Sequence, residues 1–184
     1  MTETLRIRPS KKGDGKFVMR WLTNERMMRM WCRDSFSFPL TEEQMNGYYE
    51  KFEEDPYSWG FTALNESGVP VGSFQMSRVN YEAGSVHLGY IVLDPEQRGK
   101  GIGHQMVDMA VRYAAEILGM KRITLNVFEA NPGAIRCYEK AGFVVEKRGD
   151  DDFPFQNEVW AYSVMVYTVT DKKESDKSDS GADA

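Results

Sequence analysis

Three glycines at alternate positions, Gly99, Gly101 and Gly103, mark the segment of the chain with the clearest chemical potential. Glycine has no Cβ, so the backbone around it can approach a ligand closely. The segment follows the apolar run 90–93 and precedes residues 105–118, whose apolar side chains recur with a helical period. Free N–H groups and the positive dipole end of that helix face the loop, which predicts a site for an anion such as a pyrophosphate.

The spacing of the glycines separates three phosphate-binding designs. A P-loop requires Ser or Thr after its Gly-Lys pair, whereas Gly101 follows Gly99 and Lys100 here. The dinucleotide fingerprint Gly-x-Gly-x-x-Gly does not fit alternate glycines, and it follows the first strand of a βαβ unit rather than a strand in mid-chain. What remains is the pattern Arg98-x-x-Gly101-x-Gly103, or else a tight turn with incidental glycines.

A short helix that carries a tyrosine is predicted further along the chain. Asn131 stands at the cap position, Pro132 at the first helical position, and Gly142 where a left-handed cap ends the helix. Ala134 and Tyr138 are four residues apart, so they share a face. Taken alone, such a tyrosine is usually a packing residue with its hydroxyl at the surface.

Together the two segments resemble the coenzyme A loop and the second signature motif of the Gcn5-related N-acetyltransferases, in the expected order. The resemblance covers residues 4–168 and implies an α/β (α+β) fold, with a mixed sheet of about seven strands splayed between the fourth and fifth and helices on both faces. It implies that the pantetheine arm of acetyl-CoA lies in the splayed gap and the pyrophosphate on the loop. The cofactor-binding residues that it implies are Ile91, Val92, Leu93, Arg98, Gly99, Lys100, Gly101, Ile102, Gly103, Asn131 and Ala134.

The elements that must position these residues follow from the hydrophobic pattern. Short helices are predicted over 14–22 and 24–31, and a capping box at 41–44 predicts a helix over 42–53. Apolar alternation or continuous apolar runs predict strands over 5–8, 59–64, 71–78, 85–93, 123–127 and 159–169. The strands before the glycine loop form an antiparallel meander, and the crossover helix makes the fourth and fifth strands a right-handed parallel pair.

The reaction that the resemblance implies is direct attack of an amine on the acetyl thioester. Tyr138 is the candidate that supplies a proton or hydrogen bond to the leaving thiolate, as the family motif implies. The base stays open among His87, whose reference pKa of about 6.5 suits a relay near neutrality, and the carboxylates Glu82 and Glu129. A satisfied sheet histidine is an equally good interpretation of His87. Asn126, at the end of the fifth strand, is the candidate that orients the acceptor or the thioester.

Two aromatic segments, 21–38 and 150–155, lie on either side of the splayed strands according to the resemblance, and predict the acceptor pocket. Aromatic faces cover an aliphatic or sugar body, and the acidic loop 150–152 attracts a cation, unless it is only a solvated turn. The first segment is similar to the subgroup of ribosomal-protein alanine acetyltransferases and aminoglycoside 6′-acetyltransferases. The candidate pocket residues are Trp21, Trp31, Phe36, Glu129, Asp151 and Phe153.

The 184 residues predict one domain over 1–170 and a charged, disordered tail over 171–184. A net charge of −5 argues against nucleic acid as a partner. Cys32 and Cys137 form no Cys/His cluster, so no metal site is predicted. No apolar run has the length of a membrane span and no signal-peptide core opens the chain. We therefore expect a cytoplasmic protein without membrane contact, as a monomer or homodimer.

The predicted function is an acetyl-CoA-dependent N-acetyltransferase that modifies a primary amine: a small molecule, an aminoglycoside-like compound or a protein N-terminus. Two alternatives stay open, a non-catalytic acetyl-CoA-binding sensor or interaction module, and an α/β module that binds another nucleotide. Asn131 and Tyr138 beside an intact loop favour the enzyme, because a pure binding module needs no donor for a thiolate. Calorimetry with acetyl-CoA and ATP separates the third class from the other two.

Overall fold

The computed structural model describes residues 4–170. Its centre is a seven-stranded sheet in the order β1-β2-β3-β4-β5-β9-β6, and a separate two-stranded hairpin is formed by β7 and β8. The sheet strands are β1 (Arg6–Pro9), β2 (Trp59–Leu64), β3 (Pro70–Asn80), β4 (Ser85–Leu93), β5 (Arg122–Phe128), β6 (Val144–Arg148) and β9 (Tyr162–Thr168). The hairpin strands are β7 (Phe153–Phe155) and β8 (Glu158–Trp160). The mixed seven-stranded sheet is confirmed, whereas the predicted tail over 171–184 lies outside the described residues.

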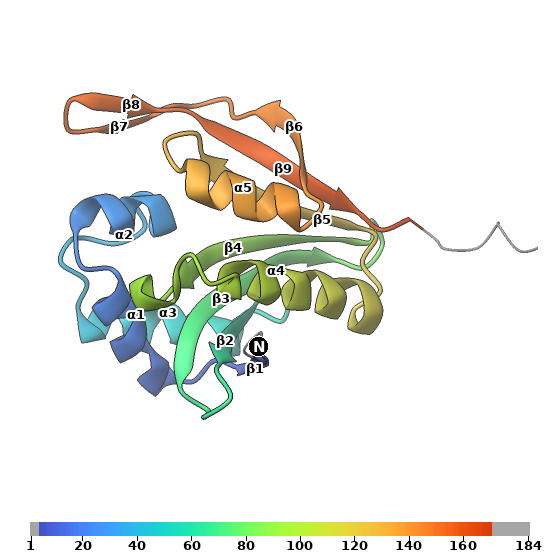
Figure 1. Cartoon of the computed structure of the whole chain (residues 1–184), viewed down its shortest axis with the longest axis horizontal. Helices are drawn as coiled ribbons and strands as arrows, with labels where there is room; N and C mark the ends of the chain where they lie inside the picture. Colours follow the sequence, from blue (N-terminus) through green and yellow to red (C-terminus); the bar gives the residue numbers. More distant parts are fainter. Residues whose placement is uncertain (1–3, 171–184) are drawn as a thin grey trace, which may run out of the picture.

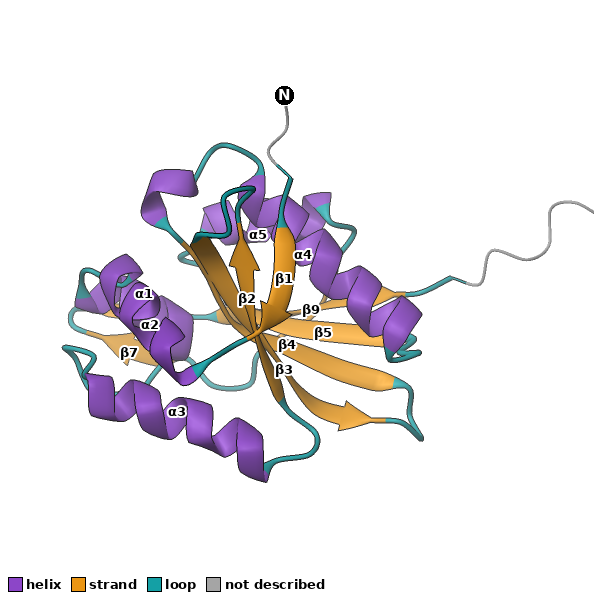
Figure 2. Cartoon of the chain, turned by 90° about the horizontal axis from the view of Figure 1, so that it is seen from below, coloured by secondary structure: helices purple, strands orange, loops and turns teal. Residues whose placement is uncertain are grey.

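Helices cover both faces of the sheet (Figure 2). One face carries α1 (Gly15–Trp21), α2 (Glu25–Cys32) and α3 (Glu42–Glu54), and the other carries α4 (Ile102–Arg112) and α5 (Pro132–Lys140). Single 3-10 turns precede α1 at Lys12–Asp14 and α4 at Pro95–Gln97, and α4 continues as one π turn over Tyr113–Ile117. None of the helices within residues 4–170 has the length and apolar character that a membrane crossing requires.

The strands β4 and β5 are parallel neighbours over a short distance only. Residues 85–88 pair with 122–125 and the pairing then stops, although β4 continues to Leu93 and β5 to Phe128. Beyond that point β4 pairs with β3 and β5 with β9. The two halves of the sheet separate toward the end that α2 covers (Figure 1). The predicted splay between the fourth and fifth strands is therefore confirmed.

A β-bulge interrupts β4 at the level of this gap. Opposite Phe74 of β3 stand two residues of β4, Tyr90 and Ile91. Tyr90 has a φ of 49°, and its carbonyl accepts a hydrogen bond from Trp31 Nε1 at 2.8 Å. Because a bulge re-aims the side chains beside it, β4 presents different residues to the two faces before and after this point.

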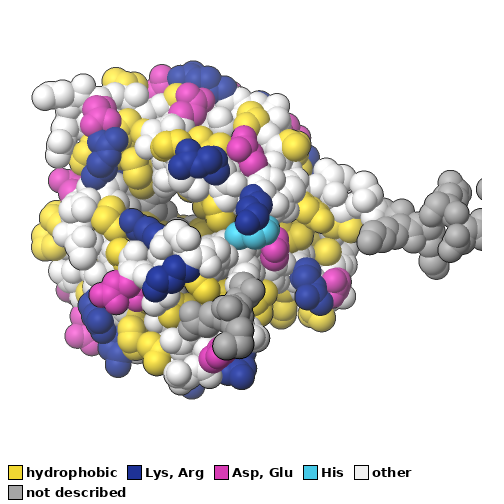
Figure 3. All heavy atoms as spheres, in the orientation of Figure 1, with side chains coloured by type: hydrophobic (Ala, Val, Ile, Leu, Met, Phe, Trp, Pro, Cys, Tyr) yellow, Lys and Arg dark blue, Asp and Glu magenta, His cyan; other side chains and the backbone are white. Residues whose placement is uncertain are grey.

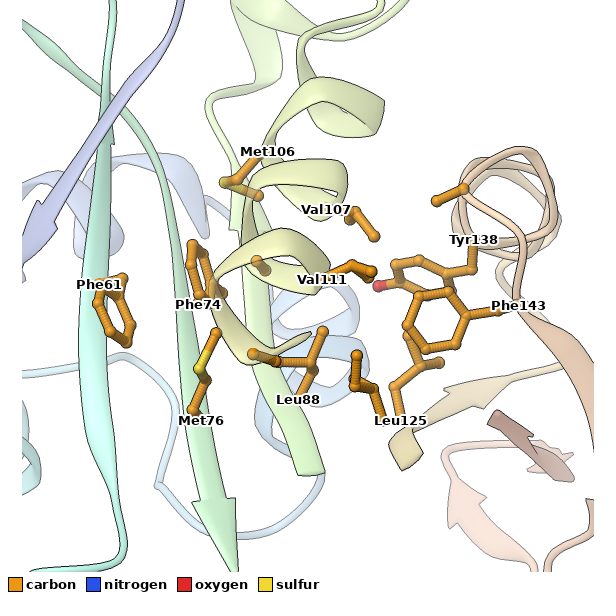
Figure 4. Packing of buried hydrophobic residues seen from close by; sticks show 14 of the residues in the cluster. Phe61, Phe74, Met76, Leu88, Met106, Val107, Val111, Leu125, Tyr138 and Phe143 are labelled. Carbon is orange, nitrogen blue, oxygen red and sulfur yellow. The ribbon is translucent and has the colours of Figure 1, made fainter. Parts of the chain in front are cut away.

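Three hydrophobic clusters hold the elements together. The largest lies between the sheet and α4 and α5, where Phe74, Leu88, Leu125 and Phe143 are almost fully buried (Figure 4). A second cluster of Val18, Trp21, Met28, Met45 and Tyr48 fills the space under α1, α2 and α3. A third, smaller cluster of Phe128, Phe153, Phe155 and Trp160 attaches the hairpin to the end of β5. Each large apolar side chain buried in this way contributes about 1.5–3 kcal/mol, so all three clusters are firm attachments.

The predicted single strand over 159–169 is in fact two strands. β8 ends at Trp160, β9 begins at Tyr162, and the carbonyl of Ala161 between them accepts a hydrogen bond from the N–H of Glu129 at 2.9 Å. Trp160 is 2% exposed inside the third cluster. Both strands are apolar, but β8 faces the hairpin cluster and β9 faces the main core. The hydrophobic pattern of the sequence therefore gives no sign that the strand is interrupted between them. The aromatic end of the segment 150–155 forms strand β7.

Candidate functional site

The glycine loop turns into the N-terminus of α4 as the sequence predicts. Gly99 has a φ of 76° and Gly101, the N-cap of α4, a φ of 82°. These left-handed values are unfavourable for residues with a Cβ. A Cβ built at either position meets no atom within 4 Å, so the backbone conformation, rather than crowding within the protein, requires glycine there.

Backbone donors and cations gather at this loop. The N–H groups from Gly99 to Gly103 have no hydrogen-bond partner among the described residues. Arg98 and Lys100 are exposed beside them, and Lys100 Nζ donates to Gln97 Oε1 at 3.2 Å. Free N–H groups at a helix start, flanked by two cations, bind phosphate oxygens. The residues present therefore fit the pyrophosphate of coenzyme A.

The edge of β4 that faces the gap suits the pantetheine arm. Ile91, Val92 and Leu93 lie beyond the last residue that pairs with β5, so this edge of the strand has no neighbouring strand. The amides of a pantetheine can pair with such backbone groups as an added strand does. The face seen in Figure 1 is hollowed between the two halves of the sheet, and Lys and Arg side chains lie beside the hollow (Figure 3).

Tyr138 projects from α5 toward α4 (Figure 4). Its side chain is 7% exposed, packs against Phe143 with ring centroids 6.3 Å apart, and directs its hydroxyl toward α4 beside Val111 (Figure 4). The hydroxyl has no hydrogen-bond partner among residues 4–170. The phenol is protonated at neutral pH at its usual pKa, and burial raises the pKa of Tyr138 further. At the start of α5, the Asn131 side chain accepts a hydrogen bond from the N–H of Ala134 at 3.2 Å.

On the face that α2 covers, a cavity of about 290 Å³ opens where β4 and β5 separate. We call it the acceptor cavity. Four elements supply most of its wall: the end of α2, the end of β3, the middle of β4 and the end of β5. The residues that line it are Met30, Trp31, Cys32, Arg33, Ser77, Arg78, His87, Leu88, Gly89, Tyr90, Asn126, Val127, Phe128 and Tyr162.

Strained backbone is concentrated around the acceptor cavity. Among residues 4–170, four residues other than glycine have a positive φ, and three of them line this cavity: Arg33 at 56°, Arg78 at 53° and Tyr90 at 49°. Such conformations cost about 1–3 kcal/mol each and persist where the surrounding structure holds them, typically at functional sites. The strained residues and the cavity therefore indicate the same candidate site.

The wall of the acceptor cavity is cationic. It contains two arginines and a histidine but no carboxylate. Arg33 forms an ion pair with Asp151 and lies over the rings of Phe153 and Tyr162, at 5.5 and 6.0 Å from their centroids. Arg78 is exposed and has neither a hydrogen bond nor an ion pair with any described residue. Its charge is therefore not neutralised by the protein.

The pKa of His87 differs from the value that the sequence suggested. Burial, and secondly the charge of Arg78, lower the pKa of His87 to about 4, well below the value of about 6.5 assumed from its type. Its Nδ1 lies 3.0 Å from Thr124 Oγ1. His87 is thus neutral at pH 7, and the expectation of a relay that titrates near neutrality is corrected. The physical reason is that burial in the cavity wall and the positive charge of Arg78 both disfavour the protonated imidazole.

Of the sequence-predicted acceptor and catalytic residues, Trp31, His87 and Asn126 line the cavity and the others do not. The carboxylates Glu82 and Glu129 are exposed outside the lining, and Glu129 accepts a hydrogen bond from Ser163 Oγ at 3.4 Å. The remaining pocket candidates lie outside the lining. Trp21 is buried at the end of α1, Phe153 belongs to the hairpin cluster, and Asp151 pairs with Arg33. Phe36 stacks on Trp31, with ring centroids 5.7 Å apart.

Each aspartate of the acidic loop has a basic partner. Besides the pair of Asp151 with Arg33, Asp150 pairs with Lys147 at 3.5 Å and Asp152 with Arg148 at 2.6 Å. The loop therefore presents little free negative charge to a cationic acceptor. Sequence reasoning missed Arg78, since a lone basic residue at the end of a strand carries no spacing signal.

Comparisons with known proteins agree with the geometry. The family model of the GNAT acetyltransferase domain matches residues 4–144. A spermidine N(1)-acetyltransferase of Vibrio cholerae is 29% identical over 154 residues, which is 83% of this chain and 86% of the relative. A peptidyl-lysine N-acetyltransferase of Escherichia coli is 31% identical over 134 residues, or 70% of this chain and 80% of the relative.

The fold also resembles that of a solved acetyltransferase. The crystal structure of the Vibrio cholerae spermidine N-acetyltransferase in complex with CoA and spermine superposes with a TM-score of 0.77 at 24% identity, covering 89% of this chain and 95% of that one. The finer subgroup suggested by residues 21–38 stays a prediction. The chain belongs to the GNAT family, and it is an acetyl-CoA-dependent N-acetyltransferase.

Proposed function

We propose that the enzyme acetylates a small primary amine that binds in the acceptor cavity. One observation carries this proposal: the cavity begins where the two strands part, because Leu88, Gly89 and residues 126–128 both border the gap and line the cavity. An amine held there faces a thioester held in the gap from the other side of the sheet. Such alignment of two reactants supplies a large part of the rate enhancement.

The groups of this chain then have separate tasks. Acetyl-CoA supplies an acetyl group activated as a thioester. The free amine attacks the carbonyl carbon, a C–N bond forms, the C–S bond breaks, the nitrogen loses one proton and the sulfur gains one. Tyr138, whose phenol is protonated at neutral pH, is the proposed donor of a hydrogen bond or a proton to the sulfur. Asn126, exposed in the cavity wall, is the proposed group that orients the amine.

The cavity wall favours the free amine without a strong base. Transfer of a proton from an ammonium with a pKa near 10 to His87 with a pKa of about 4 costs roughly 8 kcal/mol at equilibrium. The partly desolvated wall instead lowers the pKa of a bound ammonium, so that it loses its proton to water. Glu82 and Glu129 stay candidates only if the acceptor itself extends to them.

A thiol-release assay with a panel of primary amines tests the proposal. We expect CoA and an acetylated amine, identified by mass spectrometry, in equal amounts. Gly101→Val serves as the inactive control, since it removes the left-handed cap of the cofactor loop. Binding of acetyl-CoA without turnover of any amine would contradict the proposal and support the sensor interpretation.

Two further expectations stay predictions. A cytoplasmic location rests on the sequence alone. A monomer or homodimer is also untested, and one solved structure of the Vibrio cholerae relative is described as dodecameric. Light scattering on the purified enzyme, with and without acetyl-CoA, measures the oligomeric state directly.

A further inference from the structure

Resting on the proposed function, we propose that the acceptor carries a carboxylate as well as its amine, and that Arg78 binds this carboxylate. The substrate class is therefore a small amino acid rather than a polyamine. The inference comes from the charge, the backbone and the size of the acceptor cavity.

The charge of the cavity is unbalanced. Arg33 has its carboxylate in Asp151, whereas Arg78 has none among the described residues, and no Asp or Glu lines the wall. The neutral His87 supplies no counter-charge. An anionic group on the ligand would neutralise a guanidinium that has no partner in a wall without carboxylates. Arginine suits this role because its planar fork binds a carboxylate in a bidentate manner.

The backbone holds Arg78 at the cavity. Ser77 pairs with His87 and Asn80 with Ser85, so two residues of β3, Arg78 and Val79, oppose a single residue of β4. At this second bulge Arg78 has a positive φ of 53°, and the residue lines the cavity. A solvated surface arginine needs no such conformation, and strained backbone of this kind is typically maintained at sites that use it.

The size of the interaction decides between acceptor classes. Two unit charges about 6 Å apart change a binding constant by roughly 5- to 150-fold at effective dielectric constants between those of water and a protein surface. The sign is favourable for a carboxylate and unfavourable for a second ammonium, so the two classes differ by roughly 10²-fold in kcat/KM. A cavity of about 290 Å³ is at the small end of ligand sites, which suits a short chain.

The test uses amines of one length with different far ends: 5-aminopentanoate, pentylamine and 1,5-diaminopentane. We expect kcat/KM to fall in that order, by about tenfold at each step. A fourth compound, 4-aminobutylphosphonate, separates a carboxylate site from a general anion site. If the phosphonate is preferred, the anion is a phosphate-type group and the carboxylate assignment is overturned.

Variants of Arg78 assign the effect. Arg78→Asn removes the charge with a residue that tolerates a positive φ, so the fold is kept while the preference for 5-aminopentanoate over pentylamine disappears. Arg78→Glu should instead favour 1,5-diaminopentane. The matched control is Arg148→Gln, which removes an arginine outside the cavity and leaves the order of the amines unchanged. An Arg78→Asn enzyme with the wild-type preference would overturn the inference.

Binding to the enzyme–CoA complex, measured by calorimetry, separates this inference from the proposed function. Arg78-dependent binding of 5-aminopentanoate without turnover would contradict the proposed function and support the anion site. Turnover of all the amines without a carboxylate preference would support the proposed function and contradict the anion site. Neither binding nor turnover of any compound would contradict both.

Discussion

The two sides of the splayed sheet are built in different ways. The proposed cofactor side consists of two continuous segments, 89–103 and 131–138, and what it offers a ligand is mostly backbone: left-handed glycines, free N–H groups and an unpaired strand edge. The acceptor side is assembled from five separate parts of the chain, and its character comes from side-chain charge. A backbone site constrains the sequence locally, whereas a side-chain site depends on which residues the fold brings together.

The sharpest way to break this comparison is a change that acts through the backbone alone. Gly101→Val places a β-branched residue at a φ of 82°, which disrupts the N–H cradle. With two or more charge-assisted hydrogen bonds lost, the Kd of acetyl-CoA should rise by about 10³-fold in calorimetry. The control is Gly47→Val in α3, where a Cβ meets no atom within 4 Å, and circular dichroism confirms the fold of both. Similar affinity in the two variants would refute the backbone assignment.

Tyr138→Phe tests the side chain that is proposed to act on the leaving sulfur. Because only a hydroxyl is removed from a buried ring, acetyl-CoA affinity should be kept while kcat falls by about 10², the range for a lost proton donor. Tyr113→Phe, on the π turn after α4, is the matched control and should keep kcat. An unchanged kcat in Tyr138→Phe would assign the proton donor to water or another group.

The acceptor side should make the protein sensitive to acid. The pKa of His87 is about 4 in the folded protein and about 6.5 in the unfolded chain, so the unfolded state binds more protons between these values. The free energy of unfolding therefore falls as the pH is lowered from 6.5 to 4, by up to about 3 kcal/mol. Urea unfolding of His87→Asn should show a weaker fall over this window. Arg78→Asn should raise the pKa of His87 in an NMR titration.

The smallest effect is expected at the rim of the cavity. Asp151→Asn leaves Arg33 unpaired and adds positive charge to the wall. Since exposed ion pairs are weak, the KM of an amino carboxylate should fall by about two- to fivefold and that of a diamine should rise by as much, with both changes reduced by salt. Asp152→Asn, whose partner Arg148 is outside the cavity, is the control and should change neither KM. A rise in the KM of the amino carboxylate would contradict the sign of the wall charge.

The sequence predicts the frame of this molecule well for physical reasons. The turn chemistry of Gly101 and the cap of Asn131 act on their own neighbours, so their effects are visible in a short window. The parallel pair of β4 and β5 likewise follows from one crossover of the chain. The interruption between β8 and β9 at Ala161 gives no such local signal, because the sequence is apolar on both sides of it.

The acceptor side could not be predicted in this way because its properties are tertiary. The pKa of His87 depends on burial and on a charge from the neighbouring strand. In the sequence, the aspartates at 150–152 suggest a loop that attracts a cation. In the structure, each of them forms an ion pair with a basic residue. Charge composition of a segment therefore says little about the charge that a ligand meets.

The short pairing of β4 with β5 also bears on how the protein survives without its cofactor. Past Leu88, β4 has an edge inside the sheet rather than at its rim. An unpaired edge is a template for another strand, whether from a ligand or from a neighbouring molecule, and proteins usually cover or blunt such edges. Here the cover that we propose is the pantetheine arm of coenzyme A. Binding of the cofactor is therefore expected to limit how long this edge is open to a neighbouring molecule.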